Sequence, residues 1–147
     1  MEKYIVEVYA DKTIWRNEKG EFHRLGDLPA VECANGDKFW YLNGKQHRVD
    51  GPAIEYDDGY KAWYLNGKYH RVDGPAIELV DGSKDWYLND NLHRVDGPAI
   101  EYADGDKAWY LNGEELSEAE FNERTKPDPC EGKLIEIEGK KYKLTRA

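Results

Sequence analysis

A unit of about 23 residues recurs along most of this 147-residue chain, and this repeat limits the possible folds more than any other feature. Two columns of residues carry the period: the tryptophans Trp40, Trp63, Trp86 and Trp109, and the histidines His23, His47, His70 and His93. A fixed period of this size is typical of arrays in which each unit packs against its neighbours. We divide the chain into units at about 1–22, 23–46, 47–69, 70–92 and 93–115, the first of them degenerate.

Each unit has the signals of a β-hairpin followed by a second turn. In the third unit, residues 52–56 predict a short strand, and Asp57-Asp58-Gly59 predicts a tight turn. Residues 61–65 predict the return strand, and Asn66-Gly67 predicts another turn. No segment of the array has helical periodicity. The sequence therefore predicts an all-β fold, an elongated meander or solenoid of about five two-stranded repeats.

The pattern changes after residue 115. Ser117 followed by Glu120 is a capping box, which predicts a short helix over about 118–125 that ends before Pro127. Alternating apolar residues predict a β-hairpin over about 133–145. We expect residues 116–147 to cap the array, because an uncovered edge strand invites pairing with other chains.

Composition narrows the partners and the compartment. The net charge of −9 and the pI near 5.0 argue against nucleic acid as a direct partner and allow a protein with a basic surface. No run of apolar residues approaches the length of a membrane span, so no membrane contact is predicted. The charged N-terminus lacks the apolar core of a secretory signal, and Cys33 and Cys130 form no disulfide framework. We therefore predict a cytoplasmic protein with reduced cysteines.

The repeats resemble MORN repeats, in the divergent form called the MORN repeat variant. The resemblance rests on the Trp…Asn-Gly…His core of residues 63–70 and the Tyr-Asp-Asp-Gly turn of residues 56–59, and it covers about residues 6–113. One departure is that arginine follows the histidine where typical MORN units have glycine. His-Arg-x-Asp-Gly-Pro-Ala units of this kind are similar to those of proteins from bacteriophages and large viruses. The resemblance implies a scaffold or binding surface, and some MORN arrays are linked to lipid contact or dimerisation.

The repeated residues are interpreted as structural. Histidines one unit apart should lie ~10 Å from each other, too far to share a metal ion, so no metal or cofactor is predicted. The His-Arg-x-Asp motif occurs three times, whereas a catalytic site is normally unique, so no catalytic residue is predicted. We expect the aspartates of this motif to cap the Gly-Pro turn and its arginines to pair with carboxylates of a neighbouring unit. The predicted structural core is Trp15, Trp40, Trp63, Trp86, Trp109, His47, His70 and His93.

Positions that differ between units are free to specify a partner. In the third unit Tyr60 and Ala62 share a strand face with Tyr64, so these tyrosines face solvent if Trp63 and Leu65 face the core. Exposed tyrosine is typical of binding surfaces, although neutral variation on a solvated face would look the same. Units 70–92 and 93–115 also hold eleven acidic residues against four basic ones. The candidate binding residues are Tyr56, Tyr60, Tyr64, Tyr69, Asp81, Asp85, Tyr87, Asp104 and Asp106.

Three functions follow, in order of preference. The first is a non-enzymatic protein-binding factor, of phage or viral origin by resemblance, that inhibits a host defence protein in the manner of an anti-CRISPR protein. It would act as a monomer or homodimer, and its acidic residues would engage the basic partner. The alternative is a structural or self-assembling module, in which case the acidic residues only keep the array soluble. An enzyme ranks last, because no unit carries a constellation of residues that the others lack.

Overall fold

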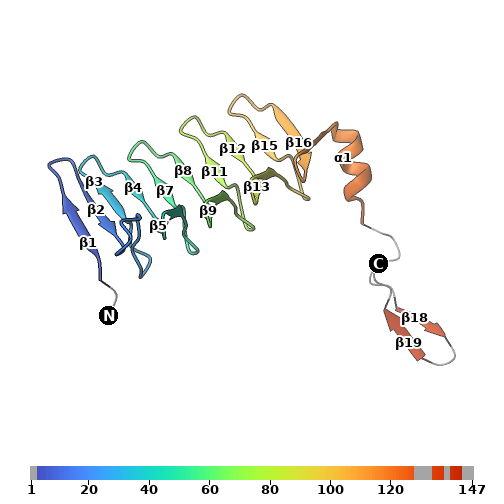
Figure 1. Cartoon of the computed structure of the whole chain (residues 1–147). Helices are drawn as coiled ribbons and strands as arrows, with labels where there is room; N and C mark the ends of the chain where they lie inside the picture. Colours follow the sequence, from blue (N-terminus) through green and yellow to red (C-terminus); the bar gives the residue numbers. More distant parts are fainter. Residues whose placement is uncertain (1–2, 128–133, 138–139, 144–147) are drawn as a thin grey trace.

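The computed structural model describes residues 3–127, 134–137 and 140–143, and its main body is an elongated antiparallel sheet that runs along the repeats (Figure 1). All-β architecture is thereby confirmed. The sheet has eleven strands, and its spatial order follows the chain order apart from the small hairpins described next. Its strands are β1 (Ile5–Val8), β2 (Lys12–Arg16), β3 (Val31–Cys33), β4 (Lys38–Phe39), β7 (Ile54–Glu55), β8 (Lys61–Ala62), β11 (Ile77–Glu78), β12 (Lys84–Asp85), β15 (Ile100–Glu101), β16 (Lys107–Leu111) and β17 (Glu114–Leu116).

Three units carry a second, smaller hairpin, which the prediction of two strands per unit missed. These hairpins pair β5 (Tyr41–Leu42) with β6 (Lys45–Gln46), β9 (Tyr64–Leu65) with β10 (Lys68–Tyr69), and β13 (Tyr87–Leu88) with β14 (Asn91–Leu92). The predicted return strand over 61–65 is therefore broken at Trp63. The break arises because the Trp63 N–H donates to Ala76 while its carbonyl accepts from His70, so the chain changes partners there. In the last unit β16 continues unbroken into the hairpin with β17.

The two faces of the main sheet differ in chemistry. On one face glutamate and lysine alternate across the strands from Glu32 to Lys107, so each carboxylate lies opposite an ammonium group. Opposite charges at directly facing positions stabilise a sheet. The other face carries a row of mostly apolar residues in register, which we call the apolar row: Ile14, Val31, Phe39, Ile54, Ala62, Ile77, Asp85, Ile100 and Ala108.

Alanine, rather than tryptophan, occupies the innermost positions. Ala30, Ala53, Ala76 and Ala99 recur once per unit and are each 0% exposed. The backbone N–H of a repeat tryptophan donates to the carbonyl of each one, at 2.8 Å in all four cases. Among the tryptophans Trp40 is buried, whereas Trp15, Trp63, Trp86 and Trp109 are half-buried. The prediction of a continuous tryptophan core is wrong in this respect, because side chains as large as tryptophan do not fit where the backbones of adjacent units approach most closely.

The array ends against a short helix. Helix α1 (Glu118–Thr125) begins at the predicted capping box, in which the Glu120 N–H donates to the Ser117 hydroxyl and the Ser117 N–H donates to the Glu120 carboxylate. The helix packs on β16 and β17, where Leu116 and Phe121 are buried. The predicted C-terminal hairpin is present as β18 (Leu134–Ile137) and β19 (Lys140–Lys143), which form a separate two-stranded sheet. Residues 133, 138, 139, 144 and 145 of that prediction, and Cys130, lie outside the described residues.

Candidate interaction surface

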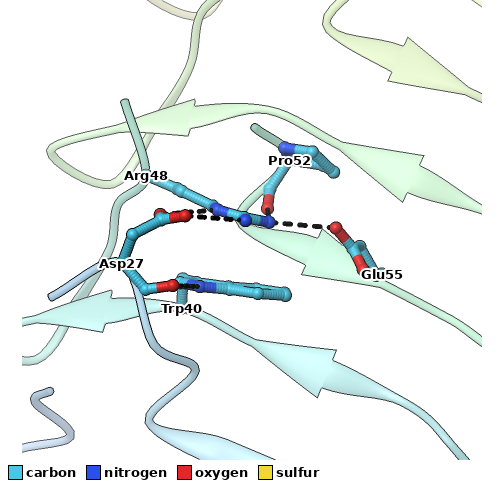
Figure 2. Close-up of polar contacts among 5 residues, drawn as sticks. All are labelled: Asp27, Trp40, Arg48, Pro52 and Glu55. Carbon is cyan, nitrogen blue, oxygen red and sulfur yellow. Dashed lines mark hydrogen bonds and ion pairs between the residues drawn. The ribbon is translucent and has the colours of Figure 1, made fainter. Parts of the chain in front are cut away.

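Each His-Arg-x-Asp motif places its arginine flat on a tryptophan ring. The Cζ atom of Arg48 lies 3.9 Å from the centroid of the Trp40 ring (Figure 2). The same guanidinium donates to both carboxylate oxygens of Asp27, to the Pro52 carbonyl and to Glu55 (Figure 2). Planar guanidinium groups are suited to stacking and bidentate bonding at once. These bonds raise the pKa of Arg48, with the hydrogen bond to Asp27 as the largest cause, and hold the pKa of Asp27 below its usual value.

This arrangement recurs and explains the motif. Arg24, Arg71 and Arg94 stack on Trp15, Trp63 and Trp86 at 3.7, 4.0 and 4.0 Å. A Cβ atom added to Gly74 would lie 2.8 Å from the Arg71 Cζ atom, so a larger residue there would displace the guanidinium that passes over the backbone. The prediction that the arginines pair with a neighbouring unit is confirmed for Arg48, which binds Asp27 of the preceding unit. Arg71 instead pairs with Asp73 and Glu78 of its own unit, and Asp73 binds this arginine rather than capping the Gly-Pro turn.

The histidines also have structural partners. The Nδ1 atom of His47 accepts a hydrogen bond from the Asn66 N–H at 3.1 Å, and His93 holds Asn112 in the same way at 3.0 Å. Asn66 has a φ of 54°, so the imidazole supports a turn residue in the left-handed region. Within the ranges that the structure describes, no group of three or more histidine, cysteine or acidic side chains could hold a metal ion.

The candidate tyrosines come together along the array. The ring of Tyr56 lies 5.2 Å from that of Tyr60, and the ring of Tyr69 lies 4.3 Å from Tyr64 and 5.3 Å from Tyr87. These distances are those of favourable aromatic pairs. Tyr56 is exposed and the other four are half-buried, so part of each ring can reach a partner. We call these five tyrosines the tyrosine strip. Ala62, expected to face outward with Tyr60 and Tyr64, is instead fully buried in the apolar row.

Asp85 is the one charged residue in the apolar row. It lies in register between Ile77 and Ile100, at the position that Phe39, Ala62 and Ala108 occupy in other units. Burial raises the pKa of the Asp85 carboxyl, and the negative charge of Asp81 raises it further. Its own charge in turn contributes to raising the pKa of Tyr60 and of Tyr87, which places it beside the tyrosine strip. Among the described residues no lysine or arginine forms an ion pair with it.

The other candidate aspartates lie at turns and are exposed. Asp81 accepts a hydrogen bond from the Ser83 N–H at 2.9 Å, and Asp104 accepts one from the Asp106 N–H at 3.0 Å. Such bonds are typical of turns that an aspartate initiates. Asp81 lies near enough to Asp85 to influence its pKa, whereas neither Asp104 nor Asp106 is among the groups that raise the pKa of Tyr60, Tyr64 or Tyr87. The structure therefore gathers Asp81, Asp85 and the tyrosines and leaves the other two aspartates apart.

The strip predicts a specific loss of stability at alkaline pH. Burial, together with the neighbouring Tyr69 hydroxyl, raises the pKa of Tyr60 to about 12. An unfolded tyrosine loses its proton near pH ~10, so the folded state binds more protons between these values and its stability falls as pH rises through them. We expect the free energy of unfolding, measured by urea denaturation across this interval, to fall less steeply with pH in Tyr60→Phe than in the wild-type chain. The difference between the two slopes should correspond to at most one bound proton. Equal slopes in the two proteins would contradict this account.

Sequence reasoning missed several aromatic residues of the same face. The rings of Phe39 and Tyr56 lie 5.7 Å apart in an edge-on contact, and Phe22 lies 5.0 Å from Tyr41. Tyr41 and Tyr110 belong to the same column as Tyr64 and Tyr87, and burial raises the pKa of both. Both lie in a column where tyrosine is constant, and the prediction of binding residues rested on columns that vary between units. The constant tyrosine that follows Trp40, Trp63, Trp86 and Trp109 was the signal that could have revealed them.

Neither membrane-spanning helices nor similar proteins give further information on the function. No helix in the described part of the chain has the length and apolar character needed to cross a bilayer. Comparisons with protein-family models, curated proteins and solved structures found no match for this chain.

Proposed function

We propose that this chain is a non-enzymatic binding protein that captures a protein with a basic surface through Asp85 and the tyrosine strip. The observation that carries the proposal is a carboxylate placed in an apolar row without a cationic partner among the described residues. Residues that break the local pattern of a fold, and whose pKa is perturbed by burial, concentrate at functional sites. The raised pKa means that the folded protein stabilises the Asp85 carboxylate less well than water does.

A lysine or arginine side chain of a partner would relieve this cost. Its charge would pair with the Asp85 carboxylate, and its aliphatic stem and cationic head would lie against the aromatic faces of Tyr60 and Tyr87. A charge pair that is shielded from water is stronger than one on an open surface. The excess of acidic residues in units 70–92 and 93–115 would add long-range attraction for a basic partner.

The repeat resemblance extends this proposal to a biological role. Chains with His-Arg-x-Asp-Gly-Pro-Ala units resemble proteins of phages and large viruses, so we propose a viral accessory factor. Acting in the host cytoplasm, it would cover a basic groove of a defence protein, as an anti-CRISPR protein does. The alternative is a self-assembling scaffold, which the exposed apolar residues of β1 favour.

Capture from a bacterial lysate by the immobilised chain tests the binding surface. We expect the wild-type chain to retain a protein of high pI. Asp85→Lys should bind this protein at least about tenfold more weakly, because the charge reversal leaves two cations facing each other. Asp85→Asn removes the charge without changing the shape and should weaken capture in the same direction. Mass spectrometry identifies the retained protein, and circular dichroism verifies that each variant is folded.

Asp50→Lys is the matched control, since it changes the net charge equally at an exposed loop position away from the strip. Equal loss with Asp50→Lys and Asp85→Lys would mean that only overall charge matters, and the proposed site would be rejected. Retention of the same basic protein by Asp85→Lys would reject it as well.

A further inference from the structure

The two edges of the main sheet differ in whether another element covers them. At the C-terminal end the last hairpin is covered by α1, with Phe121 only 3% exposed. At the other end lies β1, and among the strands that the structure describes its one partner in the sheet is β2. Exposed edge strands pair readily with other strands, and proteins usually protect them with charges, proline or a covering element.

Hydrogen bonding shows which backbone groups of β1 face outward. The Trp15 N–H donates to Ala30, the residue before β3, so Trp15 directs its backbone away from β1. Its register partner is Val6, which therefore directs its own N–H and carbonyl away from β2. Val8, two residues on, has the same orientation, whereas the Tyr9 N–H donates inward to Lys12. The polar groups of Val6 and Val8 thus line the open edge.

The side chains of this strand suit pairing rather than protection. Ile5, Val6 and Val8 are 48%, 50% and 77% exposed, although all three are apolar. Glu7 is the only charged residue of β1, and Arg16 engages its carboxylate at 3.1 Å. Proline is absent from the strand.

We propose that β1 pairs with β1 of a second copy of this chain, antiparallel about a two-fold axis, so that two arrays form one continuous sheet. Charge favours this end of the molecule. Residues 1–22 hold four basic and five acidic residues, whereas units 70–92 and 93–115 hold four basic and eleven acidic ones. Joining the N-terminal ends keeps the two acidic regions far apart and places the least repulsion at the contact.

The pairing also has a preferred register. With Val6 on the two-fold axis, Ile5 faces Glu7 of the other copy and Tyr4 faces Val8, so no like charges meet. A shift of the axis to Glu7 would place two carboxylates opposite each other, which is destabilising. A closed two-fold contact of this kind uses the same strand on both copies and ends assembly at the dimer.

Light scattering coupled to size-exclusion chromatography on the full chain tests this interface over a range of concentrations. We expect the wild-type mass to rise to twice that of one chain, and Val6→Pro to weaken dimerisation at least about tenfold, since it removes an outward N–H at a position where edge strands tolerate proline. Val8→Lys provides a second test that preserves the backbone, and Val72→Lys is the control because Val72 is 84% exposed on a distant loop.

A wild-type chain that remains monomeric at every concentration would overturn the proposal. So would dimers that persist in both β1 variants, or a Val72→Lys variant that dissociates as they do. Asp85 and the tyrosine strip take no part in this contact, so the result is independent of the lysate experiment.

Discussion

Replacing Ala76 with leucine should lower the free energy of unfolding by about 3 kcal/mol, at the upper end of the usual cost of overpacking a core. Ala76 is 0% exposed, its N–H donates to Asp85 and its carbonyl accepts from Trp63, both at 2.8 Å. Because these bonds tie Ala76 to Asp85 of its own unit and to Trp63 of the preceding unit, the longer side chain cannot be accommodated without separating the strands. Urea denaturation followed by tryptophan fluorescence measures the change.

The same substitution at Ala103 is the control, because this alanine lies exposed in a turn. It should change stability by less than about 0.5 kcal/mol. Similar losses at the two positions would show that the alanine column is not the close-packed centre of the array.

Replacing Arg71 with alanine should cost about 2–3 kcal/mol, the second largest effect that we expect. The substitution removes the stack on Trp63, the hydrogen bond to the Pro75 carbonyl and the ion pairs to Asp73 and Glu78. Lysine at this position keeps the charge but lacks the planar, forked group, so Arg71→Lys should recover less than half of the loss. Thermal and urea denaturation of the three proteins provide the comparison.

Arg124→Ala provides a matched control. Arg124 also binds one carboxylate, Glu114, through two nitrogen atoms, but both side chains are about half exposed. Ion pairs of that kind contribute about 0–1 kcal/mol. Equal losses for Arg71→Ala and Arg124→Ala would contradict the view that stacking and partial burial give the repeat arginine its importance.

Much of the fold could be predicted because its determinants are local. The 23-residue period, the Asp-Gly and Asn-Gly turns and the capping box at Ser117 each depend on a few adjacent residues. The break at Trp63 could not be predicted in the same way. It depends on hydrogen bonds to Ala76 and His70, and both of these residues lie outside the strand.

The candidate surface was predictable only in part. Columns that vary between units drew attention to Tyr60, Tyr69 and Asp85, which the structure brings into one region. The acidic composition of the last two units grouped Asp104 with them, and Asp106 stands in the same variable column as Tyr60. Neither signal carries information on where a side chain points. The strand pairing separates these aspartates from the strip, and it reveals that Asp85 lies between Ile77 and Ile100.

The amino-acid sequence by itself determined the repeating unit, the positions of its turns and the all-β class, since these follow from backbone preferences within a single unit. Only the tertiary structure decided which residues fill the centre, how Arg71 lies between Trp63 and Gly74, and which edge of the sheet is open. The physical reason is that burial, stacking and strand partners are properties of adjacent units in contact.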